Sequence, residues 1–357
     1  MRYAIIGCGR ISPNHISAAI DNKLEIVGLC DIQENMAREK ANKFNLVGKV
    51  NLYTDYKKML AEEKPELVAI ATESGEHAKI ALYCISQGCN LIIEKPIAMS
   101  LADADAIIAA SNEKDVVVSA CHQNRFNKAI QKIREAIDEN RFGRLLHGAA
   151  HIRWNRGKEY YTQAPWRGTW EQDGGALMNQ CIHNIDLLRW MMGSEIKEVM
   201  AYTDNLNHDY IDAEDLGMAL IKFSNGSYGL IEGTTNIYPQ NLEETLYIFG
   251  SNGTVKAGGK SVNIIEEWLF TDEKDCTATI RQEHSESPDN IYGFGHSSLY
   301  TDVIHAVTTG RQPLCDAIVG RQALELVLAI YKSAAEGRAV KLPLAECSTM
   351  EFKRRFK

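Results

Sequence analysis

Two segments carry side chains that could act on a hydroxyl group. In the first, an apolar run ends in Glu-Lys-Pro and puts the ammonium of Lys95 at the end of a predicted strand. In the second, a Gly-Gly pair opens a predicted helix on which Asn179 and His183 stand four residues apart and share one face. An imidazole can take a proton from an alcohol, and an ammonium can stabilise the oxyanion. Each residue also has a purely structural interpretation: Lys95 as a lysine that closes a strand, and His183 as a buried, hydrogen-bonded histidine. If both are catalytic, the residues leave open which of the two takes the proton.

A glycine turn near the N-terminus predicts a dinucleotide site. A short apolar strand ends in Gly7 and Gly9, and a helical pattern follows. Glycines there let backbone N–H groups approach a pyrophosphate at the positive end of the helix. The next apolar strand ends in Asp31, whose carboxylate can bind both ribose hydroxyls and would repel a 2′-phosphate. The sequence therefore predicts NAD, with Ser12 in the place of the usual third glycine or alanine.

The first third of the chain alternates short apolar strands with amphipathic helices, which predicts a parallel, doubly wound sheet. The carboxyl ends of such strands line the ligand crevice, and Lys95 follows one of them. The predicted strands are 2–6, 24–30, 67–71, 90–94 and 116–120, with helices at 33–44, 55–63, 75–87 and 100–112.

The pattern changes after Arg125. Hairpin signals between 196 and about 280 predict successive antiparallel strands. We expect an α/β chain with a doubly wound Rossmann domain over 1–121 and an α+β domain over 122–357, built on an open, mostly antiparallel sheet for substrate binding and oligomerisation. The other predicted elements are helices at 127–139, 174–192, 296–309 and 316–336 and a long segment at 145–154. Because an open sheet with one apolar face needs a cover, a homodimer or homotetramer is expected through 196–280.

Composition narrows the class of protein. The 357 residues carry a net charge of −8, which argues against nucleic acid as a partner. No apolar run approaches the roughly 18 residues of a membrane span, and no signal-peptide pattern opens the chain. The nine cysteines include no Cys-x-x-Cys pair. We expect a reduced, cytoplasmic protein without a structural metal.

A basic and aromatic stretch between 153 and 167 suits an anionic substrate. Guanidinium groups bind phosphate or carboxylate, and an aromatic ring can stack on a uracil. A solvated loop with tryptophans packed beneath it is the alternative. The basic residues are Arg153, Arg156, Lys158 and Arg167, opposed only by Glu159, and the aromatic residues are Trp154, Tyr160, Tyr161 and Trp166.

The chain resembles, along essentially its whole length, the glucose–fructose oxidoreductase, inositol dehydrogenase and rhizopine-catabolism (Gfo/Idh/MocA) family. The resemblance lies in the glycine turn, the Glu-Lys-Pro segment, Gln-Asn-Arg-Phe at 123–126 and the helix with Asn179 and His183. The resemblance implies a Rossmann domain, an open antiparallel sheet, and Lys95 and His183 as catalytic residues. Most relatives carry aspartate in place of Asn179. The region 152–180 is similar to a narrower group, the bacterial UDP-N-acetyl-2-amino-2-deoxyglucuronate 3-dehydrogenases, where asparagine is expected.

This narrower resemblance implies NAD-dependent oxidation of the 3′-hydroxyl of UDP-N-acetylglucosaminuronate (UDP-GlcNAcA), for surface polysaccharides such as lipopolysaccharide. Some members regenerate the cofactor with 2-oxoglutarate. The rivals are an inositol or other sugar dehydrogenase and a non-catalytic NAD-binding regulator, which has no need of both Lys95 and His183. The expected cofactor contacts are Gly7, Gly9, Arg10, Ile11, Asp31, Thr72, His77, Glu94, Lys95, Gln123, Trp166 and Arg167. The expected substrate contacts are Lys95, Arg153, Arg156, Tyr160, Tyr161, Asn179 and His183.

Overall fold

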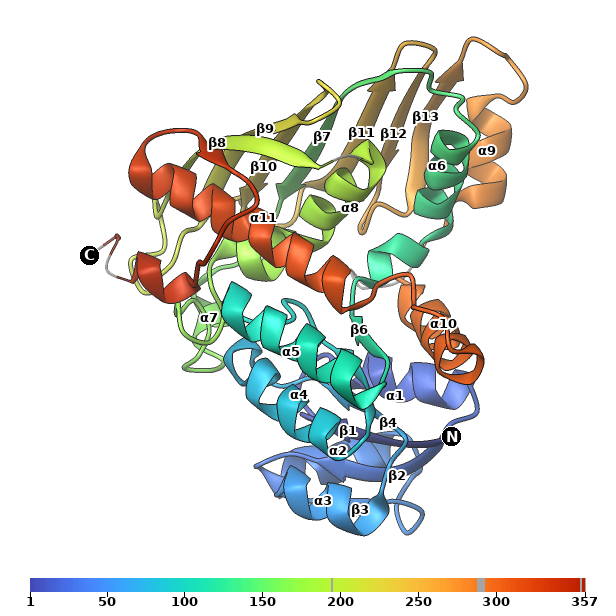
Figure 1. Cartoon of the computed structure of the whole chain (residues 1–357), viewed down its shortest axis with the longest axis vertical. Helices are drawn as coiled ribbons and strands as arrows, with labels where there is room; N and C mark the ends of the chain where they lie inside the picture. Colours follow the sequence, from blue (N-terminus) through green and yellow to red (C-terminus); the bar gives the residue numbers. More distant parts are fainter. Residues whose placement is uncertain (194, 288–292, 354, 357) are drawn as a thin grey trace. The chain divides into compact units, whose positions relative to one another are not determined.

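The computed structural model describes residues 1–193, 195–287, 293–353 and 355–356. The chain divides into two compact units (Figure 1), the first made of 1–122 with 296–321 and the second of 123–295 with 322–357. The structure thus adds the segment 296–321, which the sequence analysis put in the second domain, to the first unit.

The first unit is built on a six-stranded parallel sheet, which confirms the doubly wound prediction. Its strands are β1 (Arg2–Ile6), β2 (Glu25–Cys30), β3 (Asn51–Tyr53), β4 (Leu67–Ile70), β5 (Asn90–Ile93) and β6 (Val118–Ala120), in the order β3-β2-β1-β4-β5-β6. The central strands β1, β4 and β5 are almost entirely buried, as expected for parallel strands covered on both faces.

The helices of the first unit alternate with these strands. They are α1 (Ser12–Asp21), α2 (Glu34–Lys43), α3 (Tyr56–Glu63), the short η1 (Ser74–Glu76), α4 (His77–Ser86), α5 (Leu101–Lys114) and, from the C-terminal part of the chain, α10 (Gly295–Thr309). Side chains fix two starts: Asp55 accepts the Lys57 N–H at α3, and Ser100 accepts the Asp103 N–H at α5. Helix α10 joins the unit through Tyr300, whose hydroxyl lies 2.8 Å from that of Tyr3 in β1.

The second unit is built on an eight-stranded sheet that is antiparallel except for one parallel pair, β7 with β10. Its strands are β7 (Leu145–Arg153), β8 (Ile196–Asp204), β9 (Leu216–Phe223), β10 (Tyr228–Thr234), β11 (Glu243–Gly250), β12 (Gly253–Gly258), β13 (Ile264–Phe270) and β14 (Val340–Lys341). Their order is β13-β12-β11-β7-β10-β9-β8-β14. The mostly antiparallel sheet of the prediction is confirmed.

Helices cover one face of this sheet (Figure 1). The helical elements of this unit are η2 (Gln123–Phe126), α6 (Lys128–Asp138), α7 (Lys158–Tyr161), the π-helical η3 (Ala176–Cys181), α8 (Ile182–Met192), α9 (Thr277–His284), α11 (Ala317–Glu336) and η4 (Thr349–Phe352). Helix α8 packs closely on β7, since a Cβ on Gly148 would lie 2.8 Å from a Leu188 methyl group. The helix predicted over 174–192 is thus a π-helical turn followed by an α-helix, and α9 overlaps the end of the region predicted as strands and turns.

The opposite face of the sheet exposes apolar side chains. Leu220 in β9 stands directly opposite Leu230 in β10, and Met218 stands opposite Tyr202 in β8. All four side chains are exposed. Eight of the nine cysteines are buried. Of the helices in the described parts of the chain, none combines the length and the apolar character that a bilayer span requires.

Candidate active site

The turn between β1 and α1 has the shape that a dinucleotide requires. Gly7 has a φ of 95°, and a Cβ there would lie 2.5 Å from the carbonyl oxygen of Ala71, so only glycine fits. A Cβ on Gly9 would have no atom within 4 Å, which leaves open space beside the turn. Within the described chain, no side chain caps the first turn of α1. Its N–H groups can therefore receive a pyrophosphate.

Asp31 lies beside this turn at the end of β2. Its Oδ2 accepts the Cys8 N–H at 2.9 Å, and its Oδ1 accepts the Gln33 N–H at 2.9 Å. These bonds fix the carboxylate at the end of β2 beside the glycine turn, the part of this fold that binds the first ribose of a dinucleotide. Arg10 is exposed and Ile11 half-buried immediately after the turn. The residues present fit NAD.

The end of β5 carries Lys95, which is half-buried. The next carbonyl, that of Pro96, lies 2.8 Å from Nδ1 of His77, and Nε2 of the same ring lies 3.2 Å from the carbonyl oxygen of Thr72. Burial lowers the pKa of His77, so the ring is neutral at pH 7 and its one N–H serves one carbonyl. Thr72 and His77, both predicted cofactor contacts, thus tie the end of β4 to the end of β5.

Glu94 does not lie as predicted. Its side chain is turned into the first unit, where Oε1 lies 3.0 Å from Nε2 of His15, and the residue is only 6% exposed. A carboxylate held in this way accepts its hydrogen bonds from donors of the protein itself. The structure therefore gives no support to a cofactor contact through Glu94, although its backbone remains part of the strand end.

His183 stands in the first turn of α8, in the second unit. Its Nε2 lies 3.5 Å from Nε2 of Gln123 in η2. The two elements are joined by a buried pair in which Arg125 donates to both oxygens of Asp186 at 2.7 Å. Breaking such a pair by removing one partner costs about 3–5 kcal/mol. It therefore fixes the predicted residues Gln123 and His183 relative to each other.

Asn179 lies one turn earlier, in the π-helical segment η3. Its amide donates to the Asp173 carboxylate, which also accepts the Gly168 N–H at 2.7 Å. The next residue, Gln180, donates to the Tyr160 hydroxyl at 2.9 Å. Short π-helical segments are frequent at functional sites. The structure thus joins Asn179 to the basic and aromatic stretch.

Glu214 holds the start of η3, a role that the sequence analysis did not assign to it. Its Oε1 accepts the Leu177 N–H and the Tyr331 hydroxyl, both at 2.8 Å. Burial raises the pKa of Glu214 to about 8, so the carboxyl group is mostly protonated at pH 7. A Cβ on Gly175 would lie 1.6 Å from Oε2. The Gly-Gly pair was therefore a visible signal that the start of this helix is closely packed.

The basic and aromatic stretch brings two arginines to one ring. The guanidinium carbons of Arg167 and Arg156 lie 4.2 and 5.2 Å from the ring centroid of Tyr160. Arg167 also lies 4.7 Å from Trp166, and Arg156 lies 4.7 Å from Trp154. Among the residues that the structure describes, no carboxylate pairs with Arg167. These contacts gather positive charge around aromatic rings.

Arg153 and Tyr161 need correction. Arg153 is on β7, where Nε donates to Glu232 at 2.9 Å and Nη1 donates to Glu243. Two carboxylates already neutralise it, so the structure removes the reason for assigning it to an anionic substrate. Tyr161 is buried, with its hydroxyl 3.3 Å from Oγ1 of Thr235, which makes it a packing residue.

Two family models match the chain. Residues 1–122 match the oxidoreductase family with an NAD-binding Rossmann fold, and residues 130–256 match the GFO/IDH/MocA C-terminal domain. A curated relative, myo-inositol 2-dehydrogenase from Thermotoga maritima, is 24% identical over 96% of this chain and 98% of its own length.

Two solved structures are more similar. The WlbA dehydrogenase from Bordetella pertussis, in complex with NADH and UDP-GlcNAcA, is 37% identical with a TM-score of 0.90, over 96% of this chain and 98% of that one. The WlbA dehydrogenase from Chromobacterium violaceum, in complex with the same two ligands, is 34% identical with a TM-score of 0.87, over 96% of both chains. The chain therefore belongs to the Gfo/Idh/MocA family of NAD-dependent oxidoreductases.

Proposed function

We propose that this chain oxidises the 3′-hydroxyl of UDP-GlcNAcA to a ketone, in the cytoplasmic synthesis of surface-polysaccharide precursors such as those of lipopolysaccharide. The observation that carries the proposal is the placement of Arg156 and Arg167 around Tyr160, which is bonded through Gln180 to the segment of Asn179. A diphosphate and a carboxylate need such cations, and a neutral polyol does not. The likeness to the two WlbA dehydrogenases supports the same substrate.

Three side chains share the work of the proposed alcohol oxidation. His183 takes the hydroxyl proton, and the Lys95 ammonium stabilises the oxyanion that develops on the same oxygen. NAD, when bound, accepts the hydride from the carbinol carbon. Asn179 holds the hydroxyl or the imidazole through a neutral hydrogen bond. No carboxylate stands at position 179 to raise the pKa of the imidazole, which suits a base that acts near pH 7. We propose 2-oxoglutarate as the compound that reoxidises the cofactor.

Arg156→Ala is expected to raise the KM for UDP-GlcNAcA by about 10-fold or more, because a hydrogen bond to a charged group contributes about 1.5–3 kcal/mol. The kcat should change little, since the guanidinium takes no part in bond breaking. Added salt should weaken binding less in the variant than in the parent protein. Initial rates at several salt concentrations measure all three quantities.

Arg153→Ala is the matched control. It removes the same charge from the start of the same stretch, but from a guanidinium that Glu232 and Glu243 already neutralise. Its KM should stay at the parent value, while its melting temperature should fall. The proposal that this stretch binds the anionic ligands would be refuted if Arg156→Ala and Arg167→Ala both kept the parent KM values for the sugar nucleotide and for NAD.

We also propose that the exposed sheet face is covered by a second copy of the chain. The apolar residues of this face lie on adjacent strands and are exposed by 73% at Tyr202, 47% at Met218, 60% at Leu220 and 38% at Leu230. A contiguous apolar surface of this kind is unusual in a monomer and typical of an interface. A two-fold dimer through this face, or a tetramer built from such dimers, buries it.

Leu220→Lys should lower the mass found by light scattering towards the 39.9 kDa of one chain. A charge at the centre of the face would be buried without a partner in the assembly. Leu206→Lys is the control, because Leu206 is 64% exposed and lies between β8 and β9, outside the strands. A parent protein of one-chain mass, or an unchanged mass for Leu220→Lys, would exclude this interface.

A further inference from the structure

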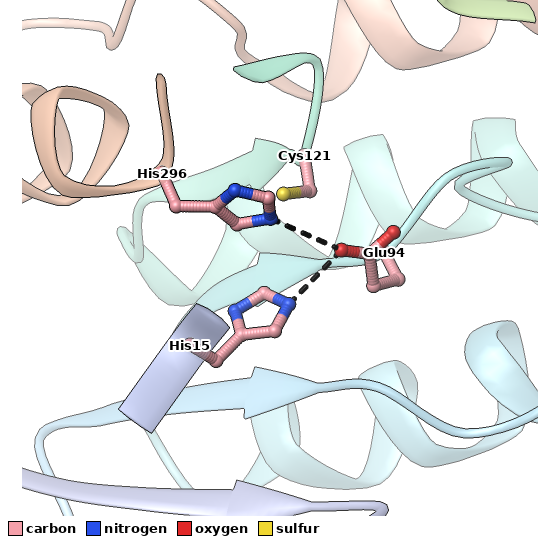
Figure 2. Close-up of side chains that lie close together, drawn as sticks. All are labelled: His15, Glu94, Cys121 and His296. Carbon is pink, nitrogen blue, oxygen red and sulfur yellow. Dashed lines mark hydrogen bonds and ion pairs between the residues drawn. The ribbon is translucent and has the colours of Figure 1, made fainter. Parts of the chain in front are cut away.

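The first unit contains a buried cluster of four polar side chains (Figure 2). His15 comes from α1, Glu94 from the end of β5, Cys121 from just after β6, and His296 from the start of α10. All four are buried, and one nitrogen, oxygen or sulfur atom of each lies within 4.8 Å of the others. Glu94 is at the centre, with Oε1 3.0 Å from Nε2 of His15 and 3.9 Å from Nε2 of His296.

Hydrogen bonds connect the cluster to β1 and α10. A carboxylate accepts, so His15 donates to Glu94 from Nε2. The other ring nitrogen of His15, Nδ1, lies 2.8 Å from the Tyr300 hydroxyl. The Tyr300 hydroxyl in turn lies 2.8 Å from that of Tyr3. This series of hydrogen bonds ends at Glu94.

The cluster keeps a negative charge inside the protein. Burial alone would raise the pKa of Glu94, but the hydrogen bond from His15, the nearby ring of His296 and the charge of Lys95 hold it well below its ordinary value. Burial lowers the pKa of His296, which keeps that ring neutral at pH 7. A buried carboxylate is tolerated when donors surround it. The Lys95 ammonium is a nearby cation for this charge.

Glu94 is also bonded to the backbone of the predicted catalytic lysine. Its Oε2 accepts the Lys95 N–H at 3.2 Å. The Glu94 N–H donates to the Ile70 carbonyl at 2.9 Å, and the Pro96 carbonyl lies 2.8 Å from the ring of His77. The strand end is therefore held on both sides of Lys95.

We propose that Glu94, oriented by His15 and His296, is a positioning residue that fixes Lys95 and keeps its ammonium protonated for the alcohol oxidation. The inference rests on the role proposed above for Lys95. It assigns a task to His15, His296 and Tyr300, none of which contacts a substrate in this account. Glu94 thus acts through Lys95, by one backbone hydrogen bond and one favourable charge.

A bound metal would require a different arrangement. Two histidines, a cysteine and a glutamate are all possible zinc ligands. Here, however, Nε2 of His15 faces Glu94 at 3.0 Å, a hydrogen-bond distance, and Nδ1 is taken by Tyr300. Zinc would need one of these nitrogens without its present partner. The hydrogen-bonded carboxylate accounts for the geometry without an ion.

The test is Glu94→Gln, which keeps the shape of the side chain and removes its charge. The kcat should fall on the order of 10²-fold, the scale of a small misplacement of a reacting group, while the KM for NAD stays near the parent value. The Lys95 pKa should fall by about one unit or more, which moves the alkaline limb of the kcat/KM profile to lower pH. The titratable groups that face Glu94 or Lys95 within this unit are His15, His77, Cys121, His296 and Tyr300.

A measurement without turnover separates this inference from the proposed function. NMR titration of protein labelled with ¹³C at lysine Cε reports the Lys95 pKa directly, with Lys95→Arg to assign the signal. The kinetics use whichever alcohol the parent protein oxidises. If the protein does not oxidise UDP-GlcNAcA, the proposed function is wrong, but the role of Glu94 can still be tested. Ser111→Ala is the control: it removes a buried hydroxyl of the same unit that donates to the Ile108 carbonyl at 2.9 Å and has no part in the cluster. Both readouts should stay at parent values.

His15→Leu is the second variant, for the case that Glu94→Gln does not fold. It removes the Nε2–H donor and leaves the carboxylate, so kcat should fall while the KM for NAD is kept. An unchanged Lys95 pKa in Glu94→Gln, or a kcat within about twofold of the parent, would overturn the inference. Zinc bound at one ion per chain in the purified parent protein and lost in Glu94→Gln would overturn it as well.

Discussion

Replacing Lys95 by Met or His183 by Ala should lower kcat by about 10²–10⁴-fold, the usual contribution of a positioned acid–base group. Both side chains act on one oxygen in the proposed reaction, one as base and one as the stabilising cation. The double variant should therefore lose much less than the product of the two single losses, because groups that act together are not additive. Steady-state rates of the three variants measure this coupling.

NAD binding provides the first control for this experiment. The glycine turn and Asp31 are untouched, so each variant should still bind NAD. The kcat/KM profile of the parent protein should show one ionisation that disappears in His183→Ala. Lys79→Met and His147→Ala change exposed residues of the same types and should leave the rates unchanged. Normal turnover in either catalytic-site variant would remove that residue from the mechanism.

Asp31→Asn should weaken NAD binding by roughly 10–100-fold and reduce the preference for NAD over NADP. The amide oxygen can still accept the Cys8 N–H that Asp31 now accepts at 2.9 Å, while the Gln33 N–H loses its acceptor. The substitution removes the negative charge, which binds the ribose hydroxyls and repels a 2′-phosphate. A hydrogen bond to a charged group contributes about 1.5–3 kcal/mol. Titration of both cofactors by fluorescence measures the two affinities.

Asp55→Asn is the matched control for this experiment. Asp55 also follows a strand of the parallel sheet, but its side chain caps α3 by accepting the Lys57 N–H. The same change of carboxylate to amide there should leave cofactor preference as it was. Turnover with NADP that equals turnover with NAD in the parent protein would refute the assignment of Asp31.

The Rossmann unit could be predicted closely because its signals are local. Apolar runs mark the buried strands, and glycines mark the turn. Strand β3 was missed because it has only three residues, of which Tyr53 alone is buried. The π-helical segment η3 was also invisible, because the residues between the Gly-Gly pair and His183 have the same apolar pattern in an α-helix.

The errors in the candidate site have a different cause, which is distance along the chain. The partners of Arg153 lie 79 residues away at Glu232 and 90 residues away at Glu243, so its neutralisation could not be seen in the stretch 153–167. In the same way, Tyr300 reaches His15 across 285 positions. The sequence could identify Lys95 as a candidate, but not the cluster behind it.

The most direct test of the central claim is the oxidation of UDP-GlcNAcA by the purified chain with NAD. The near-ultraviolet absorbance of reduced nicotinamide would be followed with this substrate, with UDP-N-acetylglucosamine, which lacks the carboxylate, and with free myo-inositol. The account predicts the highest kcat/KM for UDP-GlcNAcA and a product lighter by two hydrogens. An equal or higher kcat/KM for myo-inositol, as in the reaction that the name of the Thermotoga maritima relative describes, would contradict it.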